Sequence, residues 1–210
     1  MNRLAGIFSE DSLFGRLFGT LGDIIISNFL FVLCCLPVFT AGASLTSLHY
    51  VFLKRRRKSD EGVIRLFFSS FNENFKQSTA AWLLLLMLLL ITLIDRRAFS
   101  ENSALPGGNA LSVLFTALSI LFFTVGLYLF AVIAAFSNSL KNLILQSIFF
   151  AVTHLPQTLL MMAGIVLAVL LTLHSFFTLA FIGSLWIFFG FGLFAWLYSF
   201  LLIKIFEPYL

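Results

Sequence analysis

Few side chains of this sequence are of the types that catalysis or metal binding requires. The three histidines are isolated from one another, and Cys34 and Cys35 are adjacent, a spacing that places their side chains about 100° apart on a helix. No HExxH, GxSxG, glycine-rich phosphate loop or paired carboxylates are present. We therefore expect a protein that is not an enzyme and holds no metal or cofactor.

Asp23, His49 and His174 remain as candidate functional residues, because each lies in or beside an apolar run. All three lie toward the ends of these runs, and we expect them at the membrane interface, where water or lipid headgroups reach them. His49 is also able to point inward beside Tyr50. Of the three, it has the best claim to a binding role.

The composition indicates which environment surrounds most of the chain. Hydrophobic residues make up 60% of the 210 residues, charged residues only 10%, and 28 residues are Phe. Soluble proteins carry about 25% charged residues and expose only small apolar patches. The chain therefore belongs in a lipid bilayer, and its length favours a single integral membrane domain over residues 1–210.

Apolar runs divide the chain into candidate membrane-spanning helices of an all-α bundle. They are Leu21–Leu36, Ala41–Leu53, Thr79–Ile94, Leu111–Phe136, Gln157–Leu173 and Phe176–Ile203. Pro37 separates the first two, and Thr40 is suited to cap the helix that follows. A tight hairpin at residues 37–39 gives six spans, whereas one kinked helix gives five. We favour six.

The basic residues predict the orientation. Lys54, Arg55, Arg56, Arg57 and Lys58 form the one dense basic cluster, and the positive-inside rule places it in the cytoplasm against anionic lipid headgroups. Docking to an acidic cytoplasmic protein is the alternative role. Six spans put both termini in the cytoplasm as well. Membrane orientation thus accounts for the net charge of +4, and no nucleic-acid partner is expected.

An amphipathic segment precedes the third run. Ile64, Phe67, Phe68, Phe71 and Phe75 recur at helical spacing, with polar residues between them. We expect this elbow helix to lie flat at the cytoplasmic headgroups. The chain should then turn within residues 74–79 and enter the bilayer with Trp82 near the interface. A similar pattern at residues 139–164 indicates a weak internal repeat.

Small residues follow Pro37 in the stretch LPVFTAGASLTS. Gly42 and Thr46, like Ala43 and Ser47, are four residues apart, a spacing that lets a second helix approach closely. We favour this packing role. The alternative is a broken helix whose exposed backbone binds a substrate, as in a small transporter or channel.

Two segments together resemble a known family. The first fits an LPxxTxG pattern, and the second fits a pattern of aromatic and polar residues that ends the elbow helix. The matching positions are Leu36, Pro37, Thr40 and Gly42, followed by Phe67, Phe71, Asn74, Phe75, Gln77 and Thr79. In these residues the chain resembles the YesL-like family of uncharacterised bacterial membrane proteins, whose members are often encoded beside carbohydrate ABC importers.

The resemblance implies a role and brings no catalytic residues. It implies an accessory or regulatory partner in carbohydrate uptake in a Gram-positive plasma membrane. The partners would be importer subunits or a second copy of the chain. The alternative function is a small transporter or channel that uses the helix break at Pro37.

Overall fold

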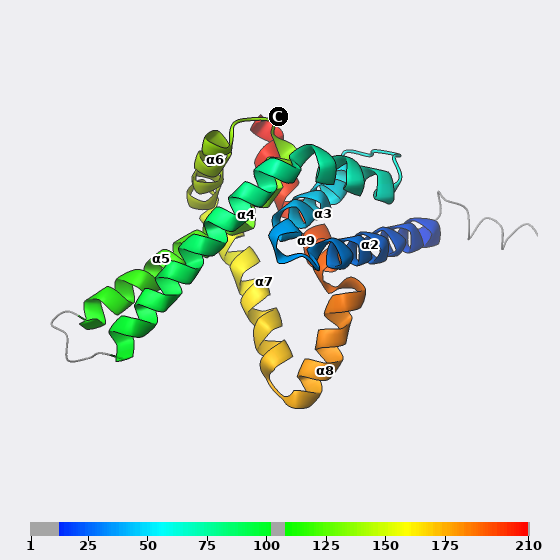
Figure 1. Ribbon diagram of the computed structural model, residues 1–210. Coiled ribbons are helices and arrows are strands. Elements are labelled where there is room, and N and C mark those ends of the chain that lie inside the picture. Colours follow the sequence, from blue (N-terminus) through cyan, green and yellow to red (C-terminus); the bar gives the residue numbers. More distant parts are fainter. Residues whose placement is uncertain (1–12, 102–107, 210) are drawn as a thin grey trace, which may run out of the picture.

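The computed structural model describes residues 13–101 and 108–209, and every regular element in these ranges is helical (Figure 1). The main helices are α2 (Leu13–Cys35), α3 (Ala41–Arg56), α4 (Val63–Glu101), α5 (Gly108–Ala135), α6 (Leu140–Thr153), α7 (Leu155–Leu173), α8 (Phe176–Leu185) and α9 (Phe191–Phe206). Shorter 3₁₀ turns cover Val38–Thr40 and Glu207–Tyr209, and a π-helical segment covers Trp186–Gly190. The predicted all-α class is confirmed.

Within the described residues, 5 helical segments are long and apolar enough to cross a membrane. They are Leu17–Cys35, Val63–Phe99, Gly108–Ala135, Leu155–Leu173 and Phe176–Tyr209. The second predicted run is not among them. It forms α3, whose 16 residues reach about 24 Å, less than the roughly 30 Å of a hydrocarbon core. Most of α3 is buried within the protein, so it is a central helix surrounded by the longer ones.

The chain reverses direction between α2 and α3. α2 ends at Cys35, and α3 begins at Ala41 after a 3₁₀ turn. Asp23 near the middle of α2 and Arg55 near the end of α3 form an ion pair of 2.8 Å, so α3 runs back antiparallel to the second half of α2. This is the predicted hairpin rather than one kinked helix. By its length α3 is not the full second span that the six-span prediction requires, but the hairpin brings Arg55 back toward the side on which α2 begins.

The predicted turn within residues 74–79 is wrong. α4 is one continuous helix of 39 residues. No Gly or Pro interrupts it, and the Asn74 side chain donates to the backbone oxygen of Ser70 inside the helix. The corresponding turn does occur in the second copy of the pattern, where the helix breaks between α6 and α7 just before Pro156.

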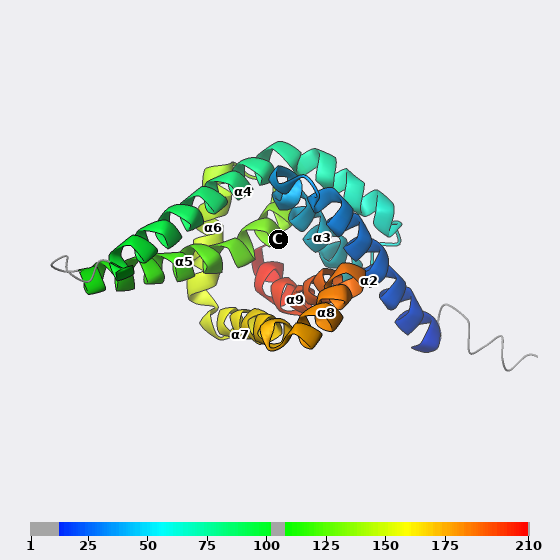
Figure 2. The same ribbon diagram turned by 60° about the horizontal axis from the view of Figure 1, so that its bottom comes forward.

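The expected headgroup helix is the first part of α4, and protein covers much of its apolar face. Val63, Leu66 and Phe67 are buried in a cluster with residues of α2, α3 and α9, whereas Ile64 and Phe68 stay exposed. The rest of α4 lies alongside the antiparallel helix α5 (Figure 1). α4 therefore changes partners along its length, and it bends between the two parts while remaining one continuous helix (Figure 1, Figure 2).

Two helical hairpins leave the centre of the molecule in different directions. The α4 and α5 pair diverges from the α7 and α8 pair in both views, and α3 and α9 lie at the centre from which both pairs extend (Figure 1, Figure 2). A second core cluster joins α5, α6 and the end of α9 through Tyr128, Phe150 and Phe206. The hairpins are thus held together at one end and separate toward the other.

Candidate functional site

The helix break at Pro37 leaves few backbone groups without partners. The Thr40 hydroxyl donates to the carbonyl oxygens of Cys34 and Pro37, and the Trp82 indole nitrogen donates to that of Val38 over 2.9 Å. Thr40 occupies the N-cap position of α3, but its side chain makes no cap hydrogen bond, because it bonds back across the turn. The predicted side-chain cap is therefore wrong, and the break is closed by internal bonds.

The small residues after the break let α3 cross α4 closely. A Cβ atom on Gly42 would lie 2.5 Å from both the backbone oxygen of Ser78 and the Cβ of Trp82. One turn further on, the hydroxyls of Thr46 and Ser78 are 2.8 Å apart. The packing interpretation of this spacing is confirmed.

The family-motif residues on α4 make local and joining contacts. Phe71 lies between Phe67 and Phe75, with ring centroids 6.3 and 5.4 Å away. The Gln77 amide nitrogen donates to the backbone oxygen of Asn138 over 2.8 Å, which ties α4 to the connection between α5 and α6. The Thr79 hydroxyl is buried and has no hydrogen-bond partner among the described residues. These residues contact one another within α4 or connect α4 to a neighbouring segment, and none of them lines the main cavity.

The basic cluster divides into bonded and exposed residues. Arg55 pairs with Asp23. The guanidinium of Arg56 donates to the Ser199 hydroxyl over 2.9 Å and stacks 3.1 Å from the Phe200 ring centroid. Arg55 and Arg56 thus fasten α3 to α2 and α9.

The rest of the cluster faces outward to different degrees. Lys54 is half-buried, with its ammonium 5.3 Å from the Tyr50 ring centroid, and Arg57 and Lys58 are exposed. These three residues form the part of the cluster that is available to headgroups or a partner.

Asn28 is a structural residue that the sequence analysis missed. It is fully buried, and its amide nitrogen donates to the Ile187 backbone oxygen over 2.7 Å. Its amide oxygen accepts from the Gly192 backbone nitrogen over 2.9 Å. It therefore satisfies backbone groups where the π-helical segment departs from regular helix bonding. A lone Asn in an otherwise apolar run was the available signal.

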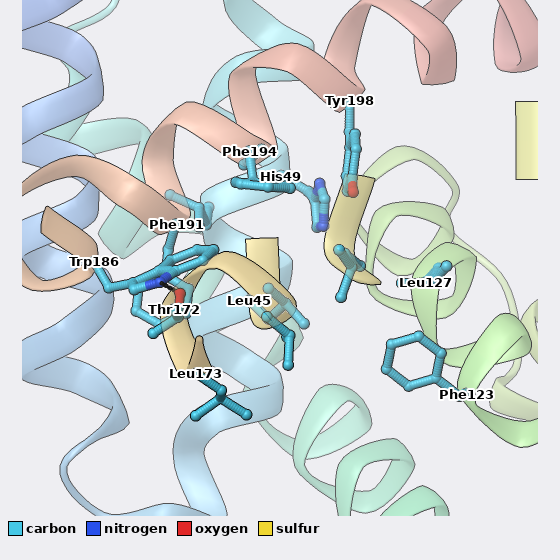
Figure 3. Close-up of a pocket in the computed structure, with 14 residues that line it drawn as sticks. Leu45, His49, Phe123, Leu127, Thr172, Leu173, Trp186, Phe191, Phe194 and Tyr198 are labelled. Carbon is cyan, nitrogen blue, oxygen red and sulfur yellow. Dashed lines mark hydrogen bonds between the residues drawn. The ribbon is translucent and has the colours of Figure 1, made fainter. Parts of the chain in front are cut away.

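The main cavity of the described residues lies between α3, α5, α7 and the segment from Trp186 through α9 (Figure 3). Its volume is about 600 Å³, and its walls are apolar apart from a few side chains such as His49, Thr172 and Tyr198. Thr172 accepts from the Trp186 indole over 3.1 Å, and the Tyr198 hydroxyl donates to the Met161 backbone oxygen over 2.7 Å. Both polar wall groups already have protein partners.

His49 lies on the wall of this cavity and not at an exposed helix end. Its side chain is only 6% exposed, so the interface position expected for it is wrong. Neither ring nitrogen bonds to a described residue, and Nδ1 is enclosed without a partner. The reason is that α3 is central to the fold, so a position near the end of an apolar run is not near the surface.

Asp23 and His174 are less enclosed than His49. Asp23 is half-buried in its pair with Arg55, and His174 is exposed at the end of α7. Among the described residues, no three His, Cys, Asp or Glu side chains gather in a way that would hold a metal ion.

The helix break, the α3 and α4 crossing and the basic cluster all fall within one segment of the chain that matches a family model. Residues 24–96 match a family described as "Protein of unknown function, DUF624". No curated protein and no solved structure matches the chain. The match supports assignment to an uncharacterised family and covers α3, whereas the other walls of the cavity lie beyond it.

Proposed function

We propose that this chain is a non-enzymatic plasma-membrane protein that acts as an accessory or regulatory partner in carbohydrate uptake, with both termini in the cytoplasm. The proposal rests on the types of the buried polar side chains and on the hydrogen bonds that they form. Apart from Asn28 and His49, the buried polar side chains among the described residues are all Ser or Thr. The Ser and Thr residues at the helix contacts form hydrogen bonds within one helix or between two helices, as residues that serve helix packing do. Their hydroxyl groups do not form a general acid and base pair for catalysis.

The divided basic cluster supports a partner role. Arg55 and Arg56 hold α3 in place, so Arg57 and Lys58 extend from a fixed helix end. Arg65 and Lys76 on the nearby first part of α4 are also exposed. Such a surface fits acidic residues of an importer subunit as well as anionic headgroups. The link to carbohydrate uptake rests on the resemblance to the YesL-like proteins.

Purification in mild detergent from cells grown on several sugars tests the partner role. We expect a permease subunit to co-purify with the unmodified chain, and the R57Q/K58Q double variant to lose it. That variant should still fold, because both side chains are exposed. K141Q is the matched control, because it removes an exposed charge on α6 that is not part of this surface. Recovery of the chain alone under every growth condition would reject the proposal.

Orientation has its own test. A single cysteine in place of Ser9, in a background without Cys34 and Cys35, should resist a membrane-impermeant thiol reagent in intact cells and react after the cells are opened. Labelling in intact cells would place the N-terminus outside.

A small transporter or channel is the second candidate, because the main cavity includes Leu45 from the stretch after Pro37. Two observations weigh against sugar passage. The cavity walls are apolar, and the carbonyls freed by the break are bonded to Thr40 and Trp82. We expect no sugar flux in proteoliposomes. Saturable flux that P37A abolishes would favour the transporter instead.

A further inference from the structure

We propose that the cavity between α3, α5, α7 and α9 binds a single-chain amphiphile, a long apolar chain that carries one O–H group, and that the O–H group bonds to His49. A fatty acid in its protonated form and a long-chain alcohol share this chemistry. The inference concerns a lipid-like ligand and does not depend on an importer partner.

The cavity suits an apolar molecule of limited size. Its volume of about 600 Å³ falls within the usual range of ligand sites, about 300–1,000 Å³. Leu48, Phe123, Leu127 and Phe194 are among its walls, and they come from three different helices. A sugar would leave most of its hydroxyl groups without hydrogen bonds here, whereas a hydrocarbon chain loses none.

His49 supplies the single polar anchor. Its imidazole lies on the cavity wall near the ring side chains of Phe194 and Tyr198 (Figure 3). It is 6% exposed and bonds to no described residue, whereas Tyr198 and Thr172 already have protein partners. A buried imidazole without partners is costly, and a leucine would serve packing better. One O–H group on a ligand satisfies one ring nitrogen.

The cavity is reached from the lipid side. Val169 and Leu173 line it, yet they are 46% and 66% exposed, so these parts of α7 belong both to its wall and to the outer surface. The α7 and α8 hairpin also diverges from α4 and α5 beside it (Figure 2). A molecule dissolved in the bilayer can therefore enter sideways, between α7 and the neighbouring helices.

Photo-crosslinking of the full chain in nanodiscs tests the proposal. The probes are palmitic acid and hexadecanol that carry a diazirine in the chain, with a diazirine phospholipid as the probe that lacks a free O–H group. We expect saturable labelling of cavity residues such as Phe194 by one or both single-chain probes, with competition by the unlabelled compound. The better probe identifies the head group. Equal labelling by the phospholipid, or labelling confined to outward faces, would overturn the proposal.

Variants separate specific binding from loss of folding. H49L should weaken labelling about two- to tenfold, the amount that one hydrogen bond contributes. V169W should reduce labelling by filling the cavity, whereas L167W, an exposed position on α7 outside the cavity wall, should not. Each variant is compared at equal monodispersity and helical content. Unchanged labelling in folded H49L and V169W would refute a site at this cavity.

Discussion

Replacing Gly42 by alanine should force α3 and α4 apart. The added methyl carbon would lie 2.5 Å from the Ser78 backbone oxygen and 2.5 Å from the Trp82 Cβ, whereas ordinary contacts begin at 3.4 Å. Neither neighbour is the end of a flexible side chain, so the helices must separate by about 1 Å at the crossing. Overpacking of this kind costs about 1–3 kcal/mol, and the rigid neighbours favour the upper end.

The assay is thermal unfolding of the purified chain in mild detergent, followed by circular dichroism. At about 2–4 °C per kcal/mol for a chain of this size, G42A should lower Tm by roughly 6–12 °C. G22A is the matched control, because no atom lies within 4 Å of its added carbon and alanine favours a helix. A Tm for G42A equal to or above that of the unmodified chain, with G22A unchanged or raised, would refute the close crossing.

Three further predictions concern Asn28, Lys58 and the Asp23 pair. N28L should lower the free energy of unfolding by about 1–3 kcal/mol, because the buried Gly192 backbone nitrogen loses its acceptor; an unchanged denaturation midpoint would contradict this role. K58G should raise Tm by a few degrees, since Lys58 adopts a positive φ of 59° after α3, a conformation that costs about 1 kcal/mol for a residue with a Cβ. A decrease in Tm would show that the lysine side chain contributes more than this strain costs. A double-mutant cycle with D23N and R55Q should give a coupling of about 1 kcal/mol that falls with added salt, and a coupling near zero would mean that the pair does not hold α2 to α3.

Much of the architecture follows from local pattern. The apolar runs and low charge specify membrane helices, Pro37 specifies a break, and Gly42 with Thr46 specifies a close crossing. Each of these depends on properties that a short segment carries by itself: side-chain hydrophobicity, the missing proline N–H and the missing glycine side chain. Neighbours elsewhere in the chain do not change them, so the sequence alone could predict them.

Tertiary packing decided the continuity of α4 and the place of the site residues. An amphipathic first part allows two outcomes: the helix ends at the membrane surface, or it continues into the bilayer. α4 continues, because α3 packs along its first part and α5 along the rest. His49 faces a cavity because α3 lies at the centre, and Asn28 meets the π-helical segment across about 160 positions of sequence. The sequence determined that this chain folds as apolar helices with a break at Pro37, because those preferences are local. Which polar groups meet, and which one is left on a cavity wall, depends on contacts between distant segments, and only the fold decides these.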